Sequence, residues 1–327
     1  MNRLDTTRRR LIAAAAAGFT LGSARAQSWP SRPIRLLVGF AAGGGADAMA
    51  RLLASRLAET IGQQVVVENR AGASGLIAAD AVARAAPDGY TLFFADTSLL
   101  IARSFGNAQA PDPVRAFTPV ALAFRAPLMI VAHPSFPATD PVSLVRALKA
   151  APGRYAYATS GIGTVHHLGF ETLKARTGSF VVHIPYRGAS QILPDVAGAQ
   201  VPLGVVSAAA GLSQARAGRV KALAMMSPDR LPGVEGVVAP LADAVPGFDV
   251  APSLFVLAPA GLPADIASKL GDAVRTALGN PATEQAAASQ GAVRTYGDAA
   301  ALQAAMAKES DLFARVIRDQ KLSPEGG

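Results

Sequence analysis

The 327-residue sequence contains no cysteine, one tryptophan and only four histidines. Without cysteine the chain has no disulfide, no thiolate nucleophile and no cysteine-ligated metal. His166 and His167 are adjacent rather than four residues apart, a spacing that disfavours a zinc site. Charged residues make up 17% of the chain and hydrophobic residues 50%, which excludes a disordered protein. The composition indicates a globular protein of two lobes, because the length is too great for one small core.

The net positive charge is small. The formal charge is +8, but residues 1–26 hold five arginines and one aspartate, so the chain without them carries +4. A charge of that size does not support a polyanion as partner, and we therefore expect no nucleic-acid binding.

Residues 1–26 have the pattern of an export signal. Arg8, Arg9 and Arg10 precede the apolar run 11–21, and Ala24-Arg25-Ala26 supplies the small residues that signal peptidase reads. The arginines resemble a twin-arginine signal. An ordinary N-terminal helix is one alternative, and a retained anchor is another, although the run is shorter than the ~20 apolar residues of a membrane span. We predict export and cleavage near Ala26.

Strands and helices alternate along the rest of the chain. In the first part we expect strands at 34–40, 65–68 and 90–95, with a helix ending at Gly62 and another over 74–86. Short connections make this a βαβαβ unit with a parallel sheet covered on both faces.

A second set of units begins near Leu128. The pattern predicts strands at 128–132, 155–159, 180–184, 201–206 and 220–225, and helices near 142–150, 165–176, 190–197 and 208–217. After a Pro/Gly-rich stretch, 228–252, we expect a strand at 254–258, a strand-like piece at 292–296 and a last helix over 298–320.

These elements predict an α/β fold of two lobes, each a mainly parallel sheet flanked by helices, with a ligand cleft between them. The expected division is an export signal over 1–26, lobe 1 from 27–127 plus 250–327, and lobe 2 from 128–249 with the crossover segments.

The strongest local signal is a glycine loop between the first strand and the first helix. Gly43, Gly44 and Gly45 lack Cβ atoms, so a ligand can approach the backbone, and their N–H groups with the helix start favour an anion. Asp47 is expected to cap this helix. A plain tight turn is the alternative.

The same loop also fits a nucleotide fingerprint. Gly43, Gly45 and Ala48, followed by Glu68 at the end of the next strand, match the dinucleotide-binding spacing. An exported NAD(P)-dependent oxidoreductase is therefore an alternative function, although the export signal weighs against it.

A matching loop follows the strand at 155–159. Ser160, Gly161, Gly163 and Thr164 lead into a helix, so both lobes would present amides and hydroxyls to one cleft. Thr97 and Ser98 add hydroxyls from the first lobe.

Catalytic patterns are weak. Ser160 is not in a Gly-x-Ser-x-Gly elbow, because Ala158 occupies the first position, and no spacing singles out a triad. His167 is expected to cap or pack at the helix start rather than contact a ligand. Arg187 follows a strand and faces either the cleft or solvent. We expect no enzyme activity and no cofactor.

In order and spacing, several stretches resemble the Bug-type solute receptors of tripartite tricarboxylate transporters. The resemblance runs from Trp29 to the C-terminus and rests on these motifs: Gly43-Gly44-Gly45-Ala46-Asp47, Val66-Val67-Glu68-Asn69-Arg70-Ala71-Gly72, Ala86-Pro87-Asp88-Gly89-Tyr90-Thr91-Leu92, Gly163-Thr164-Val165-His166-His167-Leu168, His183-Ile184-Pro185-Tyr186-Arg187-Gly188 and Leu257-Ala258-Pro259-Ala260-Gly261-Leu262-Pro263.

The resemblance implies a periplasmic binding protein of type II-like fold that holds a ligand carboxylate between the two loops. It carries the contacts onto residues of both lobes: Phe40, Ala42, Gly43, Gly44, Thr97, Ser98, Ser160, Gly161, Gly163 and Thr164. The implied partners are a small organic carboxylate and the membrane permease subunits of the transporter, or a sensor protein. We expect a monomer.

The chain departs from the family pattern at specific positions. Ala41-Ala42 stands where prolines are usual, Val206 where many members carry an aspartate, and Ser253 and Phe255 where an aromatic and a glycine are common. Loss of the acid at Val206 removes a partner for a ligand amine or hydroxyl. We therefore predict a less polar or aromatic carboxylate rather than an amino acid.

Overall fold

The computed structural model describes residues 29–107, 109–186, 189–229, 231 and 237–323. The chain divides into two compact units, 1–31 and 32–327, and the architecture below is that of the second. The predicted export signal and Arg187 lie outside the described residues. In the part of the chain that is described, no helix has the length and apolar character needed to cross a bilayer.

The six-stranded sheet has the order β11-β4-β10-β3-β1-β2. Its parallel part consists of β1 (Ile34–Val38), β2 (Val65–Asn69) and β3 (Thr91–Asp96), with β1 in the middle. Three antiparallel pairings then add β10 (Ser253–Pro259), β4 (Phe117–Arg125) and β11 (Val293–Gly297). The predicted βαβαβ unit is confirmed, and the complete sheet is mixed rather than mainly parallel.

The five-stranded sheet has the order β7-β6-β8-β5-β9. Strand β6 (Ala156–Thr159) is parallel to β7 (Val182–Pro185) and β8 (Leu203–Ser207). Strand β5 (Leu128–Ala132) is antiparallel to both β8 and β9 (Lys221–Met225). This sheet is therefore also mixed. The chain enters it on β5, directly after β4 of the six-stranded sheet, and returns to the six-stranded sheet on β10 after β9.

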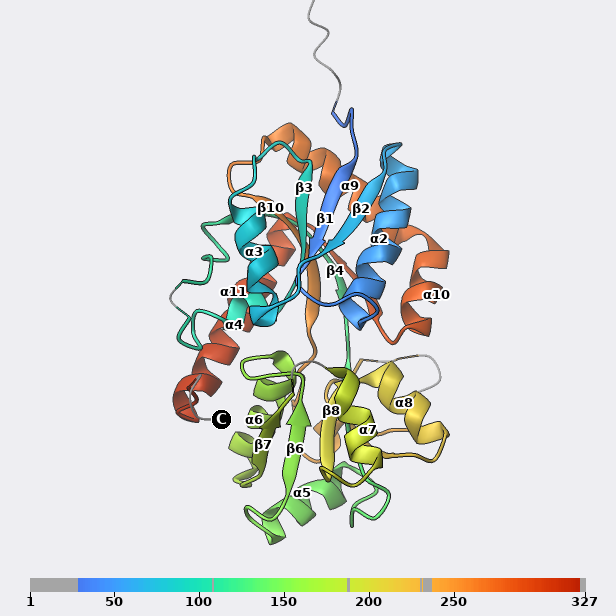
Figure 1. The fold of residues 1–327 in the computed structure, drawn as a ribbon, viewed down its shortest axis with the longest axis vertical. Coiled ribbons are helices and arrows are strands. Elements are labelled where there is room, and N and C mark those ends of the chain that lie inside the picture. The colour runs from blue at the N-terminus through green and yellow to red at the C-terminus, as the bar shows by residue number, and fades with distance from the viewer. Residues whose placement is uncertain (1–28, 108, 187–188, 230, 232–236, 324–327) are drawn as a thin grey trace, which may run out of the picture. The chain divides into compact units, whose positions relative to one another are not determined.

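Helices cover both faces of each sheet (Figure 1). The six-stranded sheet packs against α2 (Gly45–Ile61), α3 (Leu76–Ala83), α4 (Ser98–Ile101), α9 (Ala264–Gly279) and α10 (Pro281–Ser289). The five-stranded sheet packs against α5 (Pro141–Ala150), α6 (Val165–Thr177), α7 (Ile192–Ala197) and α8 (Ala208–Arg216). Three 3-10 turns complete the described elements: η1 (Ala73–Gly75), η2 (Ala189–Gln191) and η3 (Leu241–Asp243).

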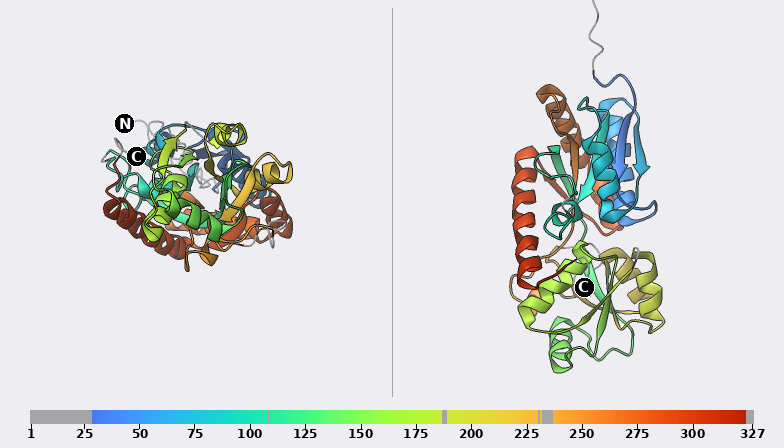
Figure 2. Two further views of the ribbon diagram at one scale, coloured as in Figure 1. Left: turned by 90° about the horizontal axis from the view of Figure 1, so that it is seen from below. Right: turned by 60° about the vertical axis from the view of Figure 1, so that its left-hand side comes forward.

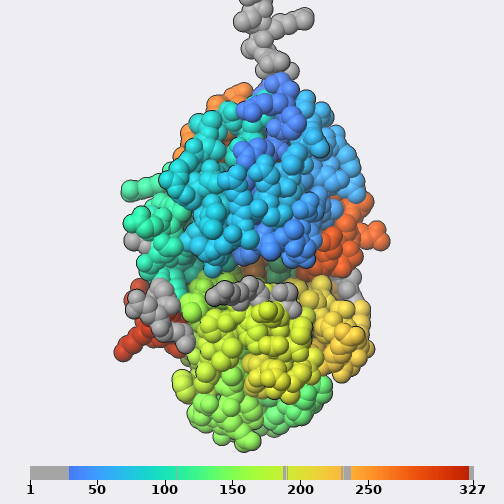
Figure 3. Space-filling model, viewed as in Figure 1, coloured from blue at the N-terminus to red at the C-terminus, as the bar shows by residue number. Residues whose placement is uncertain are grey.

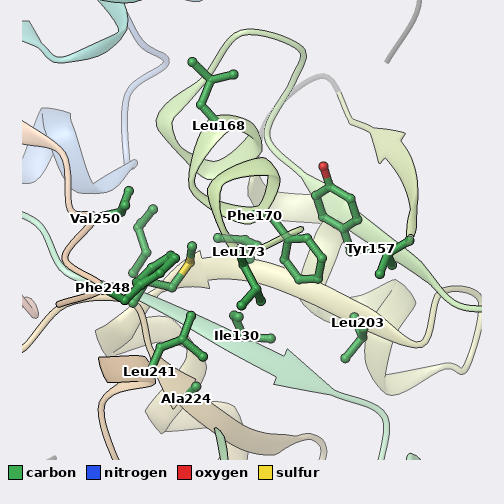
Figure 4. Close-up of a cluster of buried hydrophobic side chains, with 14 of the residues drawn as sticks. Ile130, Tyr157, Leu168, Phe170, Leu173, Leu203, Ala224, Leu241, Phe248 and Val250 are labelled. Carbon is green, nitrogen blue, oxygen red and sulfur yellow. The ribbon is translucent and has the colours of Figure 1, made fainter. Parts of the chain in front are cut away.

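The core of the five-stranded sheet is built around Tyr157 and Phe170, whose rings stack with centroids 3.8 Å apart (Figure 4). Both side chains are fully buried, together with Ile130 and Leu203 from the strands below them. This apolar layer fixes α6, and therefore the loop that leads into it, against β6.

Helix α11 (Ala299–Asp319) belongs to both lobes (Figure 2). Leu302 and Met306 lie in the core of the six-stranded sheet, whereas Phe313 and Ile317 lie in the core of the five-stranded sheet. One amphipathic helix thus joins two hydrophobic cores. The domain boundaries at 127/128 and 249/250 stay a prediction.

Two elements differ from expectation for physical reasons. Strand β4 was not predicted, because Pro119 lacks an N–H and so argues against a strand. In the structure Pro119 pairs with Leu257, next to an irregularity in the β4–β10 register. The predicted helix over 74–86 begins only at Leu76, because Ser74 has a left-handed backbone, with φ of +53°.

Candidate functional site

The first glycine loop connects β1 to α2. Gly43 has a φ of +83°, and its N–H donates to Asp47 Oδ2 at 2.9 Å. Gly44 is the N-cap residue of α2 and has an extended backbone, with φ of −82°. Asp47 therefore does not cap the helix in the usual sense; it reaches back from the first turn and holds the loop.

Asp47 is fixed in turn by two neighbours. Arg51 donates to Asp47 Oδ2 at 2.9 Å, and Asn69, at the end of β2, donates to Asp47 Oδ1 at 2.9 Å and to the Phe40 carbonyl at 3.0 Å. Burial by itself would raise the pKa of Asp47, but the hydrogen bonds from Arg51, Gly43 and Asn69 outweigh it and lower the pKa. The carboxylate is thus ionised and saturated with donors.

The second glycine loop connects β6 to α6 and repeats this arrangement. Gly163 has a φ of +73°, and its N–H donates to His167 Nδ1 at 3.3 Å. Thr164 is the N-cap of α6: its Oγ1 accepts from the His167 N–H and donates to the Gly161 carbonyl at 2.8 Å. The side chain four residues after the glycine holds the loop here too.

A buried polar cluster lies beneath this second loop. The His167 and His183 rings stack with centroids 4.0 Å apart, and His183 Nε2 lies 2.7 Å from Thr159 Oγ1. Glu171 accepts from the Tyr157 hydroxyl at 2.5 Å and from Lys174 at 2.6 Å.

Both stacked imidazoles are neutral at physiological pH. Burial lowers the pKa of His167 to about 4, helped by the nearby Lys174 charge, and lowers that of His183 to about 3. Burial also lowers the pKa of His166 to about 4.

Thr97 and Ser98, at the end of β3, are turned into the protein. Thr97 Oγ1 donates to Glu309 Oε2 at 2.6 Å and accepts from the Ser253 N–H at 2.9 Å. Ser98 donates its N–H to Asp96 Oδ1 at 2.9 Å. Burial raises the pKa of Glu309, and it raises that of Asp96 to about 7.

The two loops belong to strands whose carboxyl ends lie at the seam between the lobes of the unit 32–327 (Figures 1 and 3). Phe105, which follows α4 of the first lobe, packs its ring edge-on against His167 with centroids 6.0 Å apart. A Cβ on Gly163 would meet the same Phe105 ring at 3.4 Å. A side chain of lobe 1 therefore rests directly on the second loop.

The predicted ligand residues fall into three groups. Gly43, Gly163, Thr97, Ser98 and Thr164 each use a polar group in a hydrogen bond inside the protein. Phe40 and Gly161 also have internal hydrogen bonds, through the Phe40 carbonyl and through both backbone groups of Gly161. The backbone of Ala42 and Gly44 lies in the first loop, and Ser160 is partly exposed. Val206 is buried in the cluster beneath α7 and α8, and Arg187 lies outside the described residues.

Strand β8 runs one residue further than expected. It ends at Ser207, which is partly exposed and stands as the N-cap residue of α8. Because side chains alternate along a strand, Val206 and Ser207 point to opposite faces. The last strand residue on the face away from α7 and α8 is therefore Ser207, which the sequence analysis did not select.

The nucleotide alternative fails at its acidic residue. Arg35 holds Glu68 in a two-point ion pair, with Nε to Oε1 at 2.6 Å and a second nitrogen to Oε2 at 2.8 Å. The Arg35 hydrogen bond is the largest influence on Glu68 and lowers the pKa of its carboxyl. Glu68 thus stabilises the β1–β2 pair and is not presented to a ribose.

Three site residues escaped the sequence analysis. Asn69 and His183 lie in motifs quoted above but had no role assigned; both lie on the strand parallel to the one that carries a glycine loop. Glu309 had a clearer signal, because it falls between Met306 and Phe313 on the apolar face of α11, where an acid needs a buried partner.

No cluster of three or more metal-ligating side chains occurs among the residues that the structure describes.

Two mixed sheets flanked by helices, with glycine loops at the seam, define a two-lobed periplasmic binding protein. Solved structures support this: the R. palustris protein Rpa4515 with adipate has a TM-score of 0.82 at 31% identity, covering 90% of this chain and 99% of its own. MatC from Rhodopseudomonas palustris, with bound malate, has a TM-score of 0.77 at 29% identity, covering 88% of this chain and 100% of its own.

The family model of the tripartite tricarboxylate transporter family receptor matches residues 49–322. The protein BugT of Bordetella pertussis is 34% identical over 90% of this chain and 91% of its own. The chain belongs to this family of transporter receptors, as the motifs implied, and the comparisons give no support to the oxidoreductase alternative.

Proposed function

We propose that this chain is an exported, non-enzymatic receptor that captures a small organic carboxylate between its two glycine loops. One observation carries the proposal: each loop runs into a helix whose first amides remain free. Among the described residues, no acceptor bonds the N–H groups of Gly44, Gly45 and Ala46 at α2, or those of Val165 and His166 at α6.

Free amides at a helix N-terminus favour an anion, because the N–H groups and the helix dipole point at the same position. Each hydrogen bond to a charged group contributes about 1.5–3 kcal/mol. A few such bonds, less the cost of immobilising the ligand, reach the ~8 kcal/mol of micromolar binding.

The committed and the free groups have different roles in this proposal. Asp47, Asn69, His167 and Thr164 hold the loops in shape, and Phe40 and Gly161 are positioned by their backbone hydrogen bonds to Asn69, Thr159 and Thr164. The Gly44 amide, the Ser160 hydroxyl and the backbone of Ala42 are offered to the ligand. Thr97 and Ser98 contribute by shaping the end of β3. Ser207 replaces Val206 as the polar candidate from β8.

The ligand is a carboxylate with an apolar body. Val206 provides no acid for an ammonium group, and the relatives' structures hold adipate and malate, a less and a more polar dicarboxylate. Adipate-like acids therefore represent the favoured class for this chain, and amino acids the disfavoured one.

The proposal includes a two-lobed organisation with boundaries at 127/128 and 249/250, a periplasmic location after cleavage near Ala26, and a monomer. Ligand that bridges both lobes stabilises the closed form, and permease subunits of a tripartite transporter recognise that form.

Calorimetry with a carboxylate panel tests this function. We expect binding of apolar mono- or dicarboxylates and none of NAD(P); binding of amino acids or citrate alone would overturn the ligand class, and no carboxylate binding would overturn the function.

Gly44 offers a matched pair of variants. An added Cβ meets only the Ala41 carbonyl, at 3.5 Å, and the backbone is extended, so Gly44→Ala folds normally. Gly44→Trp should abolish carboxylate binding while its melting temperature stays close to that of Gly44→Ala. Equal affinities of the two variants would remove the first loop from the site.

A further inference from the structure

His167 makes a contact that its position in the core does not require. Its Nδ1 is the acceptor of the Gly163 N–H, so this nitrogen carries no proton and the ring proton resides on Nε2. The side chain is 0% exposed, and Gly163 is buried as well. No water can take over as acceptor at such a position without a rearrangement.

The Gly163 N–H fixes this tautomer, and the buried Nε2 makes no hydrogen bond of its own. Nε2 faces Glu171 Oε1 at 3.8 Å, and that carboxylate is held by Tyr157 and Lys174. The His183 ring stacks on one face and the Phe105 ring contacts the edge. The titratable and charged groups near His167 are thus Glu171 and Lys174 from α6 and His183 from β7, while Tyr157 of β6 contacts Glu171 and His183.

We propose that His167 is a positioning residue of the receptor: its unprotonated Nδ1 holds the Gly163 amide, and through it the backbone of residues 160–164, in the shape that meets the ligand. His183 supports His167 by stacking on its ring. Its own Nε2 is held by the hydroxyl of Thr159, the last residue of β6. This inference rests on the proposed carboxylate-binding function.

The conformation of the loop at residues 160–164 therefore depends on the protonation state of His167. A proton on Nδ1 replaces the acceptor with a donor, so two N–H groups face each other and the Gly163 amide must turn away. The lowered pKa of His167, about 4, keeps the ring neutral at pH 7 and places this change in mildly acidic solution.

Three substitutions separate the acceptor from the packing. His167→Asn places an amide oxygen near the Nδ1 position, whereas His167→Leu has similar size without an acceptor. We expect His167→Leu to weaken carboxylate binding about tenfold, the equivalent of one hydrogen bond of ~1.4 kcal/mol, and His167→Asn to restore most of the affinity. Thr283→Val is the control, because Thr283 is equally buried and donates to the Ala277 carbonyl in another part of the fold.

Equal affinity of wild type and His167→Leu for the same carboxylate would overturn the inference, as would equal losses in His167→Asn and His167→Leu. The pH profile adds a readout that packing does not move. Between pH 5 and pH 4 wild-type affinity should fall more steeply than that of His167→Asn, whose remaining fall comes from protonation of the ligand carboxylate itself. A profile that is unchanged by His167→Asn would also overturn it.

Nitrogen-15 NMR of the wild-type protein tests the same contact without ligand and without a variant. We expect an unprotonated Nδ1 on His167 at pH 7 and a Gly163 amide resonance that shifts as this ring titrates. A protonated Nδ1 at pH 7 contradicts the inference even if carboxylate binding is found. Absence of carboxylate binding with the expected tautomer contradicts the proposed function and leaves the loop contact established.

Discussion

The two glycine loops bind the N–H of a positive-φ glycine in the same way but with different side chains. In each, a glycine with positive φ follows a strand, and the residue four positions later accepts its N–H: Asp47 for Gly43 and His167 for Gly163. Each acceptor is also held from the neighbouring parallel strand, by Asn69 in the first lobe and by His183 in the second. The local geometry is repeated, but the charge is not.

The surroundings explain the difference. Asp47 has Arg51 beside it, with 53% of the Arg51 side chain exposed, so the carboxylate keeps a solvated counter-charge. His167 lies against Glu171, which is already paired with Lys174 in a buried site. A second carboxylate there would lack a partner, and a buried unpaired charge costs far more than a neutral ring. Burial thus selects a neutral acceptor for the second loop.

Removing the acceptor of the first loop should have the largest effect. Asp47→Ala leaves the Gly43 N–H and the Asn69 amide without their acceptor, and we expect a loss of about 2–4 kcal/mol in the free energy of unfolding. The loss for His167→Leu should be smaller, about 1–3 kcal/mol, because only one donor is left unpaired. Urea unfolding measures both. If His167→Leu cost more than Asp47→Ala, the number of donors would not decide the difference.

Alanine at the two glycines sharpens the comparison at the backbone. Both Gly43→Ala and Gly163→Ala place a Cβ at positive φ, which costs about 1–2 kcal/mol. A Cβ at Gly43 meets nothing within 4 Å, whereas one at Gly163 meets the Phe105 ring at 3.4 Å. The unfolding free energy of Gly163→Ala should therefore fall further. In a Phe105→Ala background the two substitutions should cost the same, and a persistent gap would rule out Phe105 as its cause.

Acid should weaken the second lobe through its histidines. His183 has a pKa of about 3 in the folded protein against 6.5 ordinarily, so the unfolded chain takes up a proton that the folded chain refuses. The contribution of neutral His183 to the free energy of unfolding is complete above pH 6.5. It is lost as the pH falls, by up to about 1.4 kcal/mol per pH unit. Asp96 acts in the opposite sense, because its pKa is raised to about 7 and its protonation favours the folded state as the pH falls.

Subtracting the unfolding free energy of His183→Phe from that of wild type at each pH cancels the contribution of Asp96, because both proteins contain it. Phenylalanine keeps a ring for stacking but does not titrate, so wild type should lose stability relative to this variant between pH 6.5 and pH 4. Parallel stability profiles for the two proteins would show that His183 is not held neutral.

The smallest effect is expected for Arg51→Met. Arg51 is exposed and its ion pair with Asp47 is screened by salt, so a change from low to high ionic strength should weaken the wild type slightly more than the variant, which keeps the other surface ion pairs. Thermal unfolding at two salt concentrations measures this. A loss as large as that of Asp47→Ala would mean that the counter-charge, rather than the loop contacts, fixes Asp47.

Much of the fold followed from local patterns. The alternation of β1, α2, β2 and β3 was predictable because glycines and short apolar runs mark each boundary, and Gly62 ends α2 with φ of +72° as expected. Strand β4 was not, because Pro119 weakens its local signal and its place between β10 and β11 comes from the sheet. Likewise, the end of β8 at Ser207, one residue beyond the predicted strand, was set by pairing with β5 rather than by local sequence.

In the candidate site, too, local features were predictable and long-range contacts were not. Both glycine loops were predictable from the residues, since a strand running through glycines into a helix is a local feature. The partners of their neighbours were not: Glu68 fits a nucleotide fingerprint in sequence but is paired with Arg35, and Thr97 looks like a free hydroxyl but bonds Glu309, 212 residues away.

The amino-acid sequence alone therefore determined where backbone amides are left open, because that depends on glycines and helix starts a few residues apart. Only the tertiary structure decided which polar side chains near the loops are already taken, because Asn69, His183 and Glu309 reach their partners from separate strands and helices. The open amides make a carboxylate receptor possible, and the long-range pairings give its two loops their different charge.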